Sequence, residues 1–138
     1  MKGLIIREPW ISMILSGTKI WEMRSRQTPY RGYVGLIRKG TGRVTAIAEI
    51  RDSLPPLDAS GFRAAREQHG IPPEKDVEVL QAGWVYPWVL DNVRVLRRAV
   101  LAGQKRGAVT WVTLLPTAIR EIERQCEQEG RRMIEVVR

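Results

Sequence analysis

Short runs of apolar residues dominate the first half of the chain and predict a series of strands. Runs with the spacing typical of strands lie at residues 2–7, 20–25, 33–38 and 43–51. A longer run at 83–96 predicts the longest strand, and a last strand is expected at 108–114. Pro87 in the long run requires a bulge, a break or an edge position, because proline has no backbone N–H to donate.

Two of these runs should differ in burial. Residues 33–38 are apolar on both faces, as expected inside a barrel or a sandwich. Residues 43–51 alternate instead, with one face formed by Val44, Ala46, Ala48 and Ile50 and the other by Arg43, Thr45, Glu49 and Arg51. This alternation predicts a half-buried strand.

Helical spacing is confined to a few segments. Residues 9–16 predict a short, largely buried helix, with Pro9 at its first position and Gly17 just after its last turn. Asp58 is a plausible N-cap for a helix that runs towards residue 70, and a second short helix should carry Val77 and Leu80. A final helix is expected after residue 116 with a stop at 130, followed by a closing strand or a loose tail at 132–137.

Because the chain shows no repeat and no linker, we expect residues 1–138 to form a single domain of the α+β class.

The most distinctive motif is the GxKxxExR pattern at residues 17–24, between the first helix and the second strand. Because side chains alternate along a strand, Glu22 and Arg24 should share one face, while Trp21 and Met23 point the other way. Lys19 can join Glu22 and Arg24 only if it lies in the turn after the helix, before the pleat begins. The motif could also be an exposed group of charges, which would contribute little to stability.

The motif and its surroundings resemble the ASCH domain family of the PUA-like superfamily. The resemblance rests on Pro9-Trp10 and Ile14 before the motif, Arg31-Gly32 after it, and Trp88-Val89-Leu90 later in the chain. It extends over residues 2–111 and implies a PUA-like small β-barrel with surrounding helices and a basic cleft where the motif residues meet. The superfamily is mostly associated with RNA, so the resemblance also implies an RNA partner.

The resemblance implies two possible enzymatic activities. One branch of the family hydrolyses N4-acetylcytidine with the motif lysine and a threonine three residues later, a position that Glu22 occupies here. Another branch resembles a metal-dependent ribonuclease, for which Glu22 would need partners such as Glu49 or Asp52. As an enzyme, the chain would use Lys19 as base or nucleophile and Glu22 as proton relay.

The positive charge is segregated along the sequence. The formal net charge is +8, and residues 1–51 contribute ten Lys or Arg against three Asp or Glu. Residues 52–82 reverse this balance, with three basic and six acidic residues. Because a charge excess that served only solubility would not need to segregate, a surface that binds a polyanion explains the pattern better.

Aromatic and basic residues that lie close together in the sequence suggest where a nucleic acid would bind. Trp10, Trp21 and Trp111 have the spacing of core residues, whereas Trp84, Tyr86, Trp88 and Tyr30 lie near arginines and could stack on bases. The predicted binding residues are Lys19, Glu22, Arg24, Arg26, Tyr30, Arg31, Arg38, Lys39, Trp84 and Trp88. Arg38 and Lys39 should make the rim of the cleft strongly basic.

The remaining composition argues against other classes of protein. Cys126 is the single cysteine, which fits a reducing compartment, and His69 is the single histidine, in a polar helix end. This pair cannot form a zinc site, and we expect no metal and no cofactor. Neither a membrane-spanning run nor the apolar core of a signal peptide is present, which suggests a cytoplasmic protein.

Three functions therefore remain open. The first is a module that binds RNA or a nucleotide in the cleft formed around the GxKxxExR motif. The second is a small hydrolase that uses the same cleft, either an N4-acylcytidine amidohydrolase or a ribonuclease. The third is a protein-interaction module whose apolar patch spans Trp84 and Trp88. The sequence leaves the physiological substrate and the oligomeric state open.

Overall fold

The computed structural model describes residues 1–103, 107 and 110–128. In chain order its elements are β1 (Lys2–Ile6), α1 (Trp10–Ser16), β2 (Trp21–Arg24), β3 (Gly32–Arg38), β4 (Arg43–Ser53), α2 (Ala59–Ala64), α3 (Arg66–His69), the 3-10 helix η1 (Pro73–Lys75), α4 (Asp76–Ala82), β5 (Tyr86–Leu101), β6 (Trp111–Thr113) and α5 (Pro116–Gln128).

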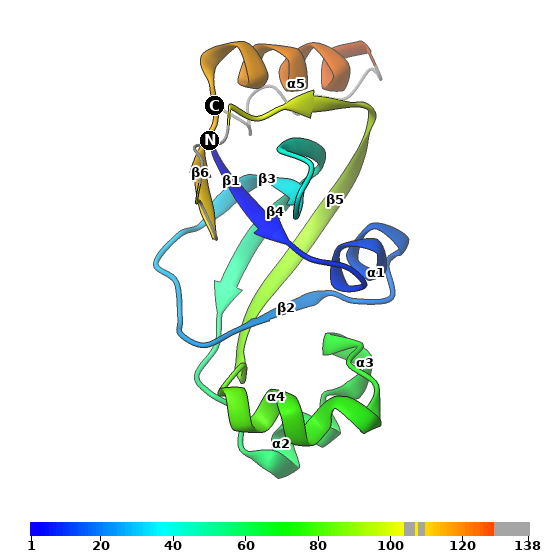
Figure 1. Cartoon of the computed structure of the whole chain (residues 1–138), viewed down its shortest axis with the longest axis vertical. Coiled ribbons are helices and arrows are strands. Elements are labelled where there is room, and N and C mark those ends of the chain that lie inside the picture. Colours follow the sequence, from blue (N-terminus) through cyan, green and yellow to red (C-terminus); the bar gives the residue numbers. More distant parts are fainter. Residues whose placement is uncertain (104–106, 108–109, 129–138) are drawn as a thin grey trace.

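The strands form one mixed sheet in the order β2-β5-β4-β3-β1-β6. Only the pairing of β1 with β3 is parallel among the described strands, and the other neighbours are antiparallel. The sheet curls into a half-barrel, with α5 at one end and α2, α3 and α4 grouped at the other (Figure 1). The predicted α+β class with a barrel-like sheet and surrounding helices is confirmed.

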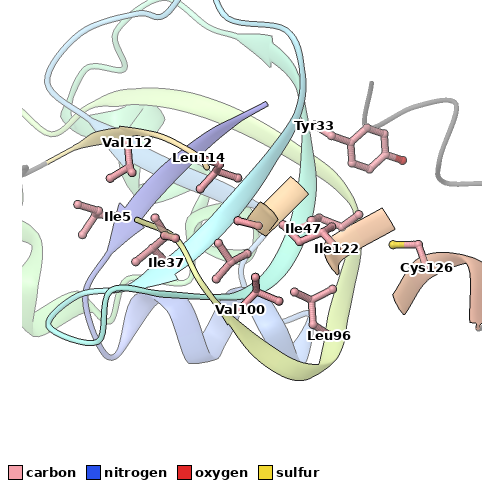
Figure 2. Close-up of a cluster of buried hydrophobic side chains, with 13 residues drawn as sticks. Ile5, Tyr33, Ile37, Ile47, Leu96, Val100, Val112, Leu114, Ile122 and Cys126 are labelled. Carbon is pink, nitrogen blue, oxygen red and sulfur yellow. The ribbon is translucent and has the colours of Figure 1, made fainter. Parts of the chain in front are cut away.

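Both faces of the curled sheet are buried. Figure 2 shows the first core cluster, in which apolar residues of the sheet pack beneath α5 through Ile122 and Cys126. The second cluster lies on the side of α1, where Ile11 and Ile14 are fully or almost fully buried against the sheet. The sheet is therefore enclosed between α1 and α5.

The alternation predicted for the fourth strand is confirmed at most positions, since Val44, Ala46, Ala48 and Ile50 are fully buried, Arg43 and Arg51 are exposed, and Thr45 and Glu49 are half-buried. It fails at the centre of the strand. Ile47 is fully buried in the cluster beneath α5, together with Val44, whereas Ala46 and Ala48 belong to the cluster on the α1 side. The physical reason is a register shift between Val44 and Ala46, which breaks the strict alternation of faces. β4 is thus buried on the α1 side and, at Val44 and Ile47, on the α5 side as well.

The long strand β5 departs from its prediction at both ends. It begins at Tyr86 rather than at residue 83, and it continues to Leu101 instead of stopping at residue 96. Pro87 lies opposite Met23 of β2, and β5 is an inner strand of the sheet. The expected irregularity is instead found opposite this end of β5, as a register shift in β4 between Ile50 and Asp52.

The helix boundaries follow the predicted signals closely. Gly17 ends α1 with φ of 86°, a left-handed conformation that costs glycine little. Pro9 is the N-cap of α1 rather than its first residue. The Asp58 side chain accepts a hydrogen bond from the Gly61 N–H at 2.7 Å, so the predicted N-cap of α2 is confirmed.

Some predicted features lie outside the described residues, namely the start of the strand expected at 108–114, the stop at 130 and the closing segment at 132–137. The prediction that the whole chain is a single domain stays a prediction. No helix within residues 1–103 and 110–128 is long and apolar enough to cross a membrane.

Candidate functional site: a cleft around a buried lysine

The GxKxxExR motif lines a cleft with a volume of about 670 Å³. Its wall includes residues of the sheet, Trp10 of α1, Val79 of α4 and Trp84 just after α4. Lys19, Glu22 and Arg24 all contribute to its wall. Seven of the ten predicted binding residues line the cleft: Lys19, Glu22, Arg24, Arg26, Lys39, Trp84 and Trp88. The structure therefore brings most of the predicted residues together.

Lys19 is positioned by the end of α1. The N–H groups of Thr18 and Lys19 both donate to the carbonyl of Met13, which closes the helix with a tight turn. The chain then enters β2 at Trp21, so Lys19 lies just before the pleat begins. This placement in the turn is the one that lets the lysine reach the face of Glu22 and Arg24.

The ammonium of Lys19 is buried. The residue is 2% exposed, and its Nζ donates a hydrogen bond of 2.7 Å to the backbone carbonyl of His69. The Trp10 ring lies beside it, with 5.3 Å between Nζ and the ring centroid, which is within cation–π range. Burial lowers the pKa of Lys19 from 10.5 to about 8; the Glu22 carboxylate opposes this shift, and the Arg24 guanidinium adds to it.

Glu22 and Arg24 form a largely buried ion pair on the same face of β2. The Arg24 Nε donates to Glu22 Oε2 at 2.8 Å, and the second guanidinium arm donates to the Ile5 carbonyl at 2.8 Å. The guanidinium also lies 5.5 Å from the centroid of the Trp88 ring. Because Arg24 is held at three points, it fixes the Glu22 carboxylate in the cleft wall.

Four tryptophans line the cleft: Trp10, Trp84, Trp88 and Trp111. The expectation that Trp10 and Trp111 are plain core residues was wrong, because each is only partly buried. Trp88, expected to be accessible, is 3% exposed; its indole N–H donates to the Arg26 carbonyl, and its ring stacks on Trp111 at 5.6 Å. Trp21 is also half-buried, but it does not line the cleft.

Three exposed cations, Arg7, Arg26 and Lys39, also line the cleft. Arg7 lies 5.6 Å from the Trp84 ring centroid. The sequence argument missed Arg7, although it directly follows the first strand and precedes the helix before the motif. Among the described residues, basic groups thus lie beside the aromatic walls of the cleft.

The other three predicted binding residues do not line the cleft. The Tyr30 hydroxyl donates to the Tyr33 carbonyl. Arg31 donates to the carbonyls of Thr28 and Tyr30, and Arg38 pairs with Glu8. These contacts hold the loop before β3 and the N-terminus of α1 in place.

The carboxylates that a metal-dependent reaction would require do not gather at the cleft. Glu22 is the one carboxylate among the described residues of the cleft wall, and it is paired with Arg24. Glu49 accepts from Asn92, and Asp52 lies 3.5 Å from Arg31. Across the described ranges, no group of three or more His, Cys, Asp or Glu is arranged to hold a metal ion. These residues do not fit a metal site.

His69 is the site residue that sequence reasoning missed most clearly. It was expected in a polar helix end, but its side chain is completely buried beneath the cleft, where it stacks on Phe62 at 4.2 Å. Its position before Gly70 marked a helix end but gave no signal of burial. Ile71, two residues later, is also buried. This apolar residue was the one feature of the sequence that could have indicated the burial of His69.

Comparison with known proteins assigns the fold and the family. The ASCH domain family model matches residues 4–130, most of the chain. The chain belongs to the ASCH domain family. The GxKxxExR motif lies within the matched residues.

Solved structures of ASCH proteins share the fold at low sequence identity. The crystal structure of ASCH from Zymomonas mobilis superposes with a TM-score of 0.69 at 10% identity, covering 88% of this chain and 92% of that one. A tyrosine-to-phenylalanine mutant of the Zymomonas mobilis protein gives 0.64 at 11% identity, covering 88% of this chain and 94% of that one. No curated protein matches the chain.

The lowered pKa of Lys19 predicts a distinct pH dependence of stability. Between pH 8 and 10.5 the unfolded chain holds the Lys19 proton more tightly than the folded chain does, so unfolding takes up a proton. In this window the free energy of unfolding of the wild type should therefore rise with pH relative to Lys19→Met. At neutral pH the variant should be more stable, by roughly 2–4 kcal/mol.

Urea unfolding of both proteins across this pH range measures the effect. Lys75→Met is the control for the loss of one charge and should follow the wild type. Lys75 is an exposed lysine of the helical lobe, which is formed by α2, α3, η1 and α4. Parallel curves for wild type and Lys19→Met would show that Lys19 is not desolvated in the fold.

Proposed function

We propose that this ASCH protein binds RNA or a nucleotide in the cleft around Lys19. The observation that carries the proposal is the combination of four tryptophans, three exposed cations and a buried Lys–Glu–Arg group in one cleft. Membership of a family that is generally associated with nucleic acids supports it.

The exposed cationic side chains would bind the phosphate groups of the ligand. Arg26 and Lys39 have no hydrogen-bond or ion-pair partner for their side chains among the described residues, so their charges are available to a ligand. Arg7 has only the Trp84 ring beside it in this part of the chain. Neutralising phosphates with such side chains releases counterions, which gives an affinity that falls with salt.

The partly exposed tryptophans would stack on the bases of the ligand. Trp10 and Trp84 are partly exposed in the cleft wall, and a base stacked on such a ring gains roughly 1–3 kcal/mol. Trp88 is too deeply buried to offer a free face and instead supports Arg24 and Trp111. A cavity of about 670 Å³ is large enough for a nucleotide, since small-molecule sites range from about 300 to 1,000 Å³.

The buried charged groups of Glu22 and Lys19 would form hydrogen bonds with polar groups of the ligand. The Glu22 carboxylate is an acceptor held by Arg24, and the Lys19 ammonium is a donor. A base or a sugar that supplies the complementary donor and acceptor would bind here in preference to one that leaves either group unpaired.

Hydrolysis in the same cleft is the second candidate, and one observation favours it. A lysine with a pKa of about 8 carries an appreciable neutral fraction near neutral pH, which a base or nucleophile requires. An acyl-amide bond of a modified nucleoside fits this chemistry without a metal ion. A protein-interaction role finds less support, since Trp88 is buried and Trp84 faces the cleft.

Substitution of the exposed cations should lower affinity through the phosphates. Arg26→Ala and Lys39→Ala should each weaken binding of single-stranded RNA and reduce the slope of log affinity against log salt by about 0.7. Arg43→Ala, at an exposed arginine outside the cleft, is the matched control. Fluorescence anisotropy at several salt concentrations measures the slopes, and equal slopes for all three variants would contradict the proposal.

Lys19→Ala separates the binding module from the enzyme. A lysine that only binds ligand should lose affinity when truncated, whereas a catalytic lysine should leave binding nearly intact while turnover collapses. Affinity for single-stranded RNA and turnover of N4-acetylcytidine and RNA are measured on the same preparations. Unchanged affinity, together with no turnover by either protein, would show that the cleft is not the working site.

A further inference from the structure

The turn formed by residues 68–71, at the end of α3, is hydrogen-bonded to Lys19 and to the residue that follows it. The Gln68 carbonyl accepts the Ile20 N–H at 2.9 Å, and the next carbonyl, of His69, accepts the Lys19 ammonium at 2.7 Å. Gly70 follows with φ of 67° and packs so closely that an added Cβ would lie 3.4 Å from Lys19 Cβ and 2.8 Å from Met13 Cε. The turn and the lysine are therefore in direct contact along both main chain and side chain.

The His69 ring fixes the shape of this turn. Its Nδ1 accepts the Ile71 N–H at 2.9 Å, and its Nε2 lies 2.7 Å from the Phe62 carbonyl. Because a peptide N–H can only donate and a carbonyl can only accept, the ring is neutral with its proton on Nε2. The ring thus links Phe62 of α2 to Ile71, the last residue of the turn, and stacking on Phe62 holds its plane.

We propose that His69 is a positioning residue for Lys19: its buried neutral ring, bonded to Phe62 and Ile71, holds the His69 carbonyl beneath the lysine ammonium and so keeps Lys19 aimed into the cleft. This inference rests on the proposed function only in taking Lys19 as the working group of the site. The position of Lys19 itself can be tested without any ligand.

The contacts support a positioning role because the ring and the carbonyl of His69 act in different directions. The carbonyl faces the cleft lysine, whereas the ring faces the interior of the helical lobe and makes none of the cleft wall. A side-chain substitution at this position leaves the carbonyl in the chain but removes what fixes its place. The effect on Lys19 therefore reports positioning rather than loss of a contact group.

The experiment is an NMR titration of the Lys19 side chain in the wild type, His69→Leu and His69→Gln. The wild-type midpoint should lie at about 8. In His69→Leu, which loses both ring bonds, the released ammonium reaches water and its pKa should rise towards 10.5. Gln retains an amide donor for the Phe62 carbonyl, so His69→Gln should give an intermediate midpoint.

Leu80→Ala is the matched control for a structural effect. Leu80 packs in the same lobe and is partly buried, and the ring of His69 bonds to and stacks on other residues, Phe62 and Ile71. This variant should be destabilised and still titrate at about 8. A folded His69→Leu protein whose Lys19 midpoint stays at about 8 or falls would overturn the proposal, because Lys19 would then remain buried without the ring.

A second variant keeps the test decisive if His69→Leu does not fold. His69→Gln, the milder of the two substitutions, loses the ring Nδ1 that accepts the Ile71 N–H and should still raise the Lys19 midpoint above about 8. An unchanged Lys19 midpoint in folded His69→Gln would then overturn the proposal.

Ligand binding adds an independent readout. If the wild type binds single-stranded RNA, His69→Leu should bind about tenfold more weakly, the equivalent of one charge-assisted hydrogen bond. If the wild type binds none, the proposed function fails, whereas the Lys19 titration still decides the role of His69.

Discussion

The candidate site depends on one interaction, the hydrogen bond between the buried Lys19 ammonium and the His69 carbonyl. A charge that is 2% exposed is costly unless the fold supplies partners, and here the fold supplies a carbonyl, the Trp10 ring and the nearby Glu22 carboxylate. These partners come from separate parts of the chain. The helical lobe, α1 and the sheet therefore each contribute one partner to this ammonium.

This constraint links stability to function. Lys19 is desolvated in the fold, and its pKa falls to about 8. This desolvation lowers the stability of the folded protein, whereas an apolar residue at the same position would not. Proteins commonly retain such destabilising groups where chemistry or recognition requires them. The Arg24–Glu22 pair follows the same logic, because it is largely buried but held by the Ile5 carbonyl and the Trp88 ring. The cleft thus brings together three charged side chains that are buried or largely buried, those of Lys19, Glu22 and Arg24.

The sequence predicted the sheet and the motif face well, because both follow local periodicity. The alternation along β2 correctly placed Glu22 and Arg24 together, and Gly17 correctly predicted the turn that delivers Lys19. The burial of Ile47 beneath α5 and the exposure of Trp10 to the cleft were not predictable, since both depend on which elements pack there. His69 was missed for the same reason: its partners Phe62 and Lys19 are brought together only by the folded lobe.

The five tryptophans allow a direct test of the central claim that the cleft binds RNA or a nucleotide. Each indole N–H gives a separate signal in a proton–nitrogen NMR spectrum, and four of these residues line the cleft whereas Trp21 does not. On addition of a single-stranded RNA oligonucleotide, the signals of Trp10, Trp84, Trp88 and Trp111 should move while that of Trp21 stays in place. Binding that leaves these four signals unmoved, or that shifts Trp21 alone, would contradict the account.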